Sequence, residues 1–128
     1  MSTEPRARVA ALRGATTVDS DTPEDIVEAT LELLSELLDR NGVARADIIS
    51  IVFTSTQDLT AEFPALAARK LGLTEVPLLC AAEIAVPGAL KRCVRVLLHL
   101  NVERDPAGLR HAYLRGASEL RTDLSGSI

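Results

Sequence analysis

Residues 76–100 read VPLLCAAEIAVPGALKRCVRVLLHL, and the architecture that the sequence predicts is built around this stretch. Two apolar runs of strand length, residues 76–83 and 91–100, flank the sequence AVPG, whose Pro-Gly pair is a strong turn signal. Each run carries a charge that a plain core strand would lack, because Glu83 closes the first run and Arg95 lies inside the second. We therefore predict two neighbouring strands that place an acid and a base in one polar pocket.

The second run alternates in polarity, which gives Arg95 two possible roles. Val94, Val96, Leu98 and Leu100 share one parity, and Cys93, Arg95, Leu97 and His99 share the other. An antiparallel sheet with one solvated face produces this alternation without any function. The pattern alone leaves open whether Arg95 faces solvent or a pocket.

Upstream, residues 8–13 (RVAALR) predict a first strand that ends in the small residues GATT. Arg13 then stands at the carboxyl end of a strand, where open α/β sheets tend to bind ligands. The alternative is an exposed arginine at a strand end, since arginine is mostly exposed.

A long helix follows this strand. Thr22 is a suitable N-cap, Pro23 fits the first helical position, and apolar residues recur at helical spacing until Asn41-Gly42 ends the pattern. We expect this helix to cover one face of a sheet. Residues 48–55 (IISIVFTS) predict a second strand, and their near-continuous β-branched run suggests a central position buried on both faces.

A shorter helix is predicted from near Phe63, with Pro64 at its first position, to residues 70–71 before Gly72. It carries Arg69, which is either a pocket cation or a surface residue that complements the helix dipole. Beyond the two central runs we predict a tight helical turn at 88–91, a loop at 101–108, a short strand at 111–114 and a mobile tail at 121–128.

These elements predict a single domain over residues 1–128 of the α+β class, close to α/β. Its mixed β-sheet of about five strands would carry one long and one short helix on one face.

Composition excludes several classes of protein. The net charge of −4 and the pI near 5.2 argue against nucleic-acid binding. The first residues lack the apolar core of a signal peptide, and no apolar run approaches the roughly 20 residues that span a bilayer. We therefore expect a cytoplasmic protein without membrane contact. The two cysteines, Cys80 and Cys93, have no zinc-type spacing and are expected to be reduced thiols, with Cys80 by default a small core residue.

The chemistry that remains is rich in fixed positive charge and poor in nucleophiles. The sequence shows no nucleophile elbow, phosphate-binding loop, dinucleotide fingerprint or metal-ligand cluster, so no cofactor is expected. The candidate residues at strand ends and on the short helix are Arg13, Arg69, Glu83, Arg95 and Tyr113. This set suits the binding of a small anionic molecule, with catalysis by electrostatics and confinement.

Several blocks, in order and with matching spacing from residue 8 onward, resemble the monofunctional, trimeric α/β-barrel type of chorismate mutase. The blocks are RGATTV at 13–18, TPEDI at 22–26, TSTQDL at 54–59, FPA at 63–65 with Arg69, VPLLCAAE at 76–83, GALKRCVRV at 88–96, RHAYL at 110–114 and LRTDL at 120–124. The resemblance implies a homotrimer shaped like an α/β-barrel, with chorismate as substrate, prephenate as product and sites at the subunit interfaces.

The resemblance also implies a role for each site residue. Arg95 would reach the ether oxygen and a carboxylate of chorismate, and Arg13 would bind the side-chain carboxylate with Tyr113 beside it. Glu83 would accept a hydrogen bond from the ring hydroxyl, and Cys80 would line the ring.

Other contacts would come from elsewhere in the trimer. The neighbouring subunit would supply Phe63, Ala65 and Arg69, while Leu120, Arg121 and the tail would close the site.

Two positions depart from the family's pattern. Leu66 stands where relatives often have lysine, and Leu79 stands where familiar members have threonine, which is tolerable if only its backbone contacts the ligand.

Two further interpretations remain open. One is a non-enzymatic trimeric sensor of aromatic-pathway anions that uses the same pocket. The other is a reactive-imine deaminase, a small trimer with interface sites, whose characteristic blocks are not evident in this chain.

Overall fold

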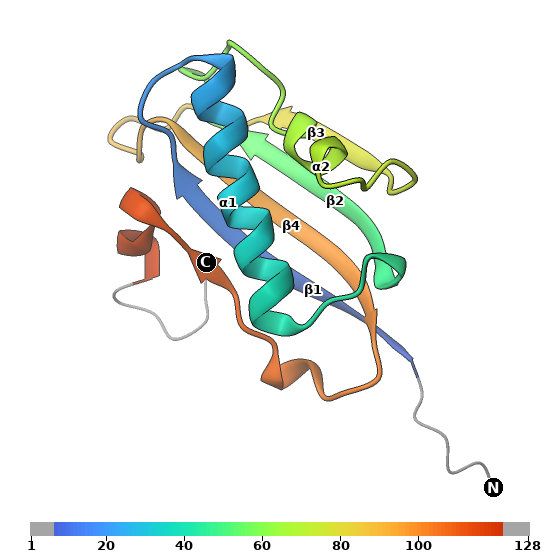
Figure 1. Ribbon diagram of the computed structural model, residues 1–128. Coiled ribbons are helices and arrows are strands. Elements are labelled where there is room, and N and C mark those ends of the chain that lie inside the picture. Colours follow the sequence, from blue (N-terminus) through green and yellow to red (C-terminus); the bar gives the residue numbers. More distant parts are fainter. Residues whose placement is uncertain (1–6, 122–128) are drawn as a thin grey trace, which may run out of the picture.

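The computed structural model describes residues 7–121 as a five-stranded mixed sheet with two helices on one of its faces (Figure 1). The elements are β1 (Arg8–Thr17), α1 (Pro23–Asn41), η1 (Arg45–Asp47), β2 (Ile48–Ser55), α2 (Leu66–Lys70), β3 (Leu78–Ala82), β4 (Cys93–Val102), η2 (Pro106–Gly108), β5 (Ala112–Tyr113) and η3 (Arg115–Arg121), where η marks a 3-10 helix. The predicted α+β class, strand number and one-sided helix layer are confirmed.

The strand order is β3-β2-β4-β1-β5. β4 is central and pairs antiparallel with β1 and β2, whereas β3 runs parallel to β2 and β5 runs parallel to β1. The prediction that the runs carrying Glu83 and Arg95 form neighbouring strands is therefore wrong, because β2 lies between β3 and β4. The segment between the two runs crosses over β2 instead of making a hairpin.

Helix α1 has the predicted ends. The Thr22 hydroxyl accepts a hydrogen bond from the Asp25 N–H at 3.2 Å, and Gly42 closes the helix in the left-handed region at φ 59°. The buried face of α1 packs on the sheet so closely that a Cβ on Gly14 of β1 would lie 2.9 Å from Leu33 and 3.0 Å from Leu37. A glycine is thus required where strand and helix approach.

Several boundaries differ from the prediction. β1 continues through the small residues to Thr17 because it pairs with β4 along its whole length, and β4 likewise extends to Val102. α2 begins at Leu66, since residues 63–65 form a tighter turn in which Phe63 and Pro64 accept bonds from Leu66 and Ala67.

Three further predictions concern residues 88–91, strand β2 and the C-terminal tail. The helical turn predicted at 88–91 is wrong, because Gly88 adopts φ 84° in a turn after Pro87 and no helix follows. β2 is an inner strand as predicted, but its second face is only partly buried. The tail predicted to be mobile lies, from residue 122 onward, outside the described residues.

Within residues 7–121, no helix combines the length and apolar character of a membrane span.

Candidate active site

The face of the sheet opposite the helices carries a hollow of about 310 Å³ that brings three predicted site residues together. Its lining consists of Arg13, Gly14, Ala15, Val52, Thr54, Arg95, Val96, Leu97 and Tyr113. Strand register explains the grouping, because Arg95 of β4 lies opposite Ala15 of β1 and Thr54 of β2. The alternation along β4 therefore separates core residues from residues that face this hollow.

Glu83 joins the group through an ion pair with Arg95. The Arg95 Nε lies 3.3 Å from Oε1 and 3.2 Å from Oε2 of Glu83. The side chains are 35% and 16% exposed respectively, so solvent screens the pair only in part. In the described part of the chain no hydrogen bond holds the two Nη atoms of Arg95, which leaves the outer edge of the guanidinium able to donate to a ligand.

The main chain of Glu83 is held on both sides. Its N–H donates to the Ser55 carbonyl at 2.9 Å and so prolongs the pairing of β3 with β2 by one residue. The Gln57 side chain donates to the Glu83 carbonyl at 3.0 Å. Glu83 thus has a fixed position although it follows the end of its strand.

Thr54 is a site residue that sequence reasoning did not single out. Its hydroxyl donates a hydrogen bond to the Glu83 Oε2 at 2.6 Å. In the sequence Thr54 looks like an ordinary β-branched strand residue, and only the pairing of β2 with both β3 and β4 reveals its place beside Glu83 and Arg95.

Arg13 and Tyr113 border the hollow from β1 and β5. The Arg13 N–H donates to the His111 Nδ1 at 2.9 Å, and the Leu114 N–H donates to the Ala15 carbonyl at 2.9 Å, so the short β5 is tied to β1 on both sides of its two paired residues. Tyr113 and Leu120 pack against a small buried cluster formed by Ala15, Cys93 and Ala117. The side chain of Arg121 lies outside what the structure describes.

Phe63 and Cys80 line a second hollow, of about 300 Å³. Cys80 pairs with Phe53 of the core, so its side chain lies on the helix side of the sheet, away from Arg95. Leu79 faces the other way and is 61% exposed. Within one chain, Phe63 and Cys80 are therefore not in the hollow that holds Arg95.

The remaining predicted residues lie around α2. Ala65 and Leu66 are partly buried and pack on the main core, whereas Arg69 is exposed and borders a separate hollow with Leu73 and Leu78. A single chain does not bring Arg69 to the Arg95 site.

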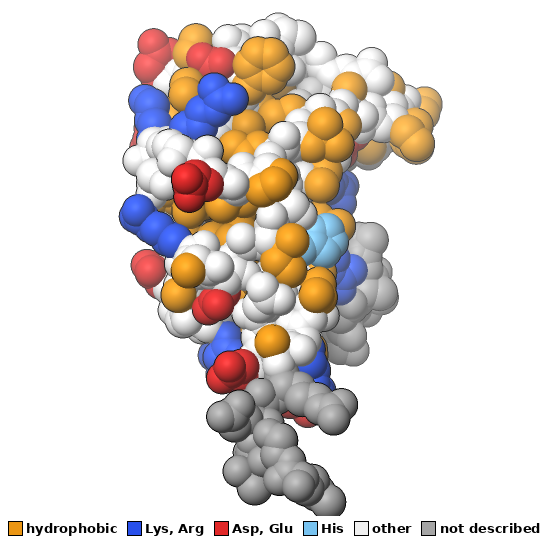
Figure 2. Space-filling model, turned by 90° about the vertical axis from the view of Figure 1, so that its right-hand side faces the viewer, with side chains coloured by type: hydrophobic (Ala, Val, Ile, Leu, Met, Phe, Trp, Pro, Cys, Tyr) orange, Lys and Arg blue, Asp and Glu red, His pale blue; other side chains and the backbone are white. Residues whose placement is uncertain are grey.

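Large apolar side chains are exposed near β3 and along the sheet. Phe63 is 70% exposed, Ile84 86%, and Val86, Leu79 and Val9 are each more than half exposed. Figure 2, which views the side of the molecule that carries β3 in Figure 1, shows hydrophobic side chains spread over much of this surface. Large contiguous apolar patches are typical of interaction sites in soluble proteins.

Two groups near the start of β4, Cys93 and Asp58, have shifted pKa values. Burial raises the pKa of the Cys93 thiol to about 11. Burial alone would raise the pKa of Asp58, but hydrogen bonds from the Thr56 hydroxyl and the Arg92 N–H lower it below its ordinary value. Those bonds tie the loop before β4 to the loop after β2, and Arg92 keeps a positive φ of 46° there.

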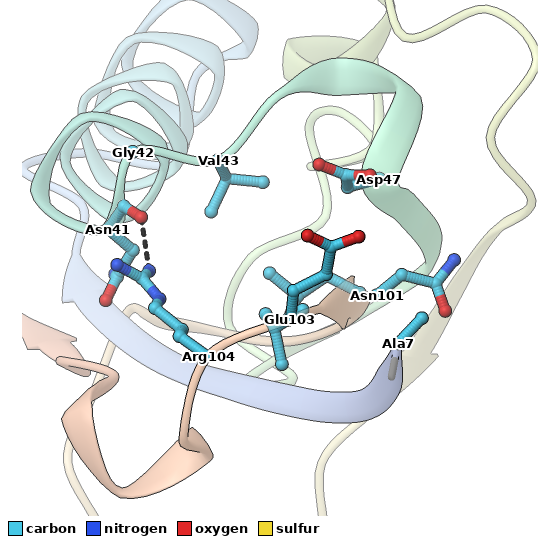
Figure 3. Close-up of a pocket in the computed structure, with 10 residues that line it drawn as sticks. Ala7, Asn41, Gly42, Val43, Asp47, Asn101, Glu103 and Arg104 are labelled. Carbon is cyan, nitrogen blue, oxygen red and sulfur yellow. Dashed lines mark hydrogen bonds between the residues drawn. The ribbon is translucent and has the colours of Figure 1, made fainter. Parts of the chain in front are cut away.

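A further hollow of about 440 Å³ lies where β4 ends, away from Cys93. Figure 3 shows the carboxylates of Asp47 and Glu103 beside this hollow. It also shows the guanidinium of Arg104 donating a hydrogen bond to the backbone oxygen of Asn41. None of the predicted site residues lines it, and the described residues hold no cluster of three or more metal-ligating side chains there or elsewhere.

Comparisons with known proteins identify the family of the chain. Residues 9–124 match the profile of the family described as chorismate mutase type I. Chorismate mutase AroH of Thermus thermophilus is 48% identical over 120 residues, which cover 93% of this chain and 98% of that protein. Chorismate mutase AroH of Bacillus subtilis is 40% identical over 115 residues, covering 89% and 91% respectively.

A solved structure of a chorismate mutase from Clostridium thermocellum superposes with a TM-score of 0.84 at 50% identity, covering 85% of this chain and 97% of that one. The sequence comparisons and the fold comparison thus indicate the same family. The chain belongs to the chorismate mutase type I family.

Proposed function

We propose that this protein is an isomerase that rearranges chorismate to prephenate, a step of aromatic amino-acid biosynthesis, in the hollow around Arg95. The observation that carries the proposal is the fixed Arg95–Glu83 pair at the edge of a hollow that also holds Arg13 and Tyr113. Family membership supports the reaction, and the residue types support its mechanism.

The reaction suits a site with few nucleophiles. The [3,3] rearrangement is unimolecular, so the protein must hold the substrate in its compact conformation and stabilise the charge that develops as the ether bond breaks. An arginine remains charged at any accessible pH. We assign the developing charge on the ether oxygen to Arg95, whose Nη atoms are left available by the pairing of Nε with Glu83.

The other assignments follow the geometry of the hollow. Arg13, on the neighbouring β1, binds the side-chain carboxylate with Tyr113 beside it, and Glu83 accepts a hydrogen bond from the ring hydroxyl. These side chains are partly shielded from solvent, so their electrostatic contacts with the substrate are stronger than the same contacts in bulk water. We assign Leu79 and Cys80 to contacts through the backbone of β3. The Cys80 side chain packs toward the helices, whereas the Leu79 side chain lies on the opposite face and is 61% exposed.

We further propose that the active form is a homotrimer whose sites lie between subunits. Phe63 is largely exposed and Arg69 lies apart from Arg95 within one chain, so both would complete the site of a neighbouring copy. The exposed Leu79, Ile84 and Val86 provide apolar surface that such an interface would bury. We place the protein in the cytoplasm, where its two free cysteines remain reduced.

The test is a chorismate assay on the purified protein. Loss of chorismate absorbance with prephenate formed in equal amount, by a species with the light-scattering mass of three chains, is the expected result. Binding of chorismate without turnover would indicate a sensor, and ammonia release from an imine substrate would indicate a deaminase. A fully active monomer would contradict the shared site.

A further inference from the structure

We propose that Thr54 is a positioning residue, which orients Glu83 and through it Arg95. This inference rests on the proposed roles of Glu83 and Arg95 in the rearrangement. Thr54 lies on β2, the strand between those that carry the two charged residues, and it is paired with Arg95 on one side and Ala81 on the other. Its side chain therefore leaves the sheet on the face of the hollow, which it lines.

The Thr54 hydroxyl carries one hydrogen atom, and through it donates a hydrogen bond to Oε2 of Glu83 at 2.6 Å. A hydroxyl-to-carboxylate bond of this length belongs to the strong, charge-assisted class. This bond holds Oε2 of Glu83, while Arg95 Nε donates a hydrogen bond to Oε1 at 3.3 Å. The rotation of the carboxylate about its last bond is thereby restricted.

The orientation of Glu83 determines which edge of Arg95 meets the substrate. With the carboxylate against Nε, neither Nη atom has a hydrogen-bond partner among the described residues, so both are left for a ligand. If the carboxylate turned, it would compete for the Nη atoms that the proposed transition-state contact requires. Thr54 therefore favours the productive arrangement of Glu83 and Arg95.

Threonine suits this role better than serine. Its branched Cβ restricts the χ1 angle in a strand, so the hydroxyl is held in one direction before the substrate binds. Serine keeps the donor but rotates more freely. Valine keeps the shape and removes the donor, which leaves Oε2 of Glu83 without that partner.

The experiment compares Thr54→Val and Thr54→Ser with the parent trimer in steady-state assays of chorismate turnover. Loss of a hydrogen bond to a charged group predicts a fall in kcat of roughly 10- to 100-fold for Thr54→Val. KM should change by less than about threefold, because the effect acts on the transition-state contact. Thr54→Ser should recover most of the lost kcat.

A matched control is Thr30→Val, which removes a buried hydroxyl bonded at 2.7 Å to the Ile26 carbonyl within α1, on the other side of the sheet. It should lower stability and leave kcat unchanged. A double-mutant cycle gives a second readout: in a Glu83→Gln background, Thr54→Val should cost little further activity. Independent, additive losses would place the effect of Thr54 elsewhere and overturn the proposal.

The outcomes separate this inference from the proposed function. If Thr54→Val turns over within twofold of the parent while Arg95→Gln is inactive, the positioning role is wrong and the function stands. If Arg95→Gln is itself nearly as active as the parent, the proposed site is wrong. Should Thr54→Val fail to assemble, Thr54→Ala, which also removes the donor, takes its place in the assay and in the cycle with Glu83→Gln, and turnover within twofold of the parent overturns the positioning role.

Discussion

His111 Nδ1 accepts the backbone N–H of Arg13 at 2.9 Å, although the two residues lie 98 positions apart. The imidazole thus takes the place of a carbonyl and continues the pairing of β5 with β1, and the guanidinium of Arg40 donates to the His111 carbonyl at 2.8 Å. Because Nδ1 is an acceptor, it carries no proton in this arrangement. The histidine supports the backbone of a proposed substrate-binding residue, which gives it a structural role near the site.

The pH dependence of turnover distinguishes a supporting histidine from an acid–base catalyst. The rearrangement transfers no proton, so kcat should be nearly flat from about pH 6 to 9, whereas an essential acid and base produce a bell. A fall confined to the acid limit is compatible with the mechanism. A bell centred near neutrality that His99→Asn or His111→Asn abolishes would contradict it.

Cys80 should not be chemically required. Its side chain packs toward the helices beside Phe53, on the face of the sheet away from the hollow that holds Arg95. We expect Cys80→Ser to keep kcat within about threefold of the parent, because no thiol takes part in the transition-state contact. Complete inactivity of this variant in an intact trimer, measured by the chorismate assay, would assign the thiol a role that this mechanism lacks.

Cys93 should make stability fall at high pH. Burial raises its pKa to about 11 in the folded chain from an ordinary value of 9.0. The folded state therefore binds more protons than the unfolded state between pH 9 and 11, and stability decreases as pH rises through that window. Urea denaturation at pH 8 to 11 should show a steeper decline for the parent than for Cys93→Ala. Parallel declines would show that this thiol does not titrate differently on unfolding.

Gly14→Ala should destabilise the fold through crowding between β1 and α1. The added methyl group would meet Leu33 at 2.9 Å, Leu37 at 3.0 Å and the Ala112 carbonyl at 3.2 Å. The leucine tips can shift but the carbonyl belongs to the backbone of β5, so we expect a loss of about 1–3 kcal/mol in unfolding free energy. Gly108→Ala is the control, since open space surrounds that position. Equal unfolding midpoints for the two variants would refute the packing argument.

The sequence predicted best those features that depend on local chemistry. The ends of α1 follow from its caps at Thr22 and Gly42, and the bounds of β2 follow from a β-branched run between polar segments. Local signals were weaker for the small residues after Arg13, which look like a strand exit yet pair with β4 as far as Thr17. Pairing across the sheet overrides the low strand propensity of that segment.

The site depended on the strand order, which no local pattern contains. Glu83 and Arg95 were predicted to meet across two adjacent strands, and they do meet, but over an intervening strand. Thr54 escaped notice for the same reason, since Glu83 lies 29 residues away, just after β3, and Arg95 is brought beside Thr54 by the register of β2 with β4. The resemblance to a family supplied roles that periodicity left open between a pocket and a solvated face.

The turnover of Arg95→Gln tests the central claim most directly. If Arg95 contacts the breaking ether oxygen, the contact strengthens in the transition state, so kcat should fall more than KM rises. Removal of one preorganised donor typically costs about 10²–10³ in rate. Arg95→Lys should recover only part of the loss, because lysine keeps the charge but lacks the planar fork.

The measurement is kcat of Arg95→Gln, with the trimer verified by light scattering. Our account predicts a loss of about a hundredfold or more, with kcat falling in the order parent, Arg95→Lys, Arg95→Gln. A value within about threefold of the parent would contradict it, because an arginine that merely faces solvent makes no contact that strengthens in the transition state.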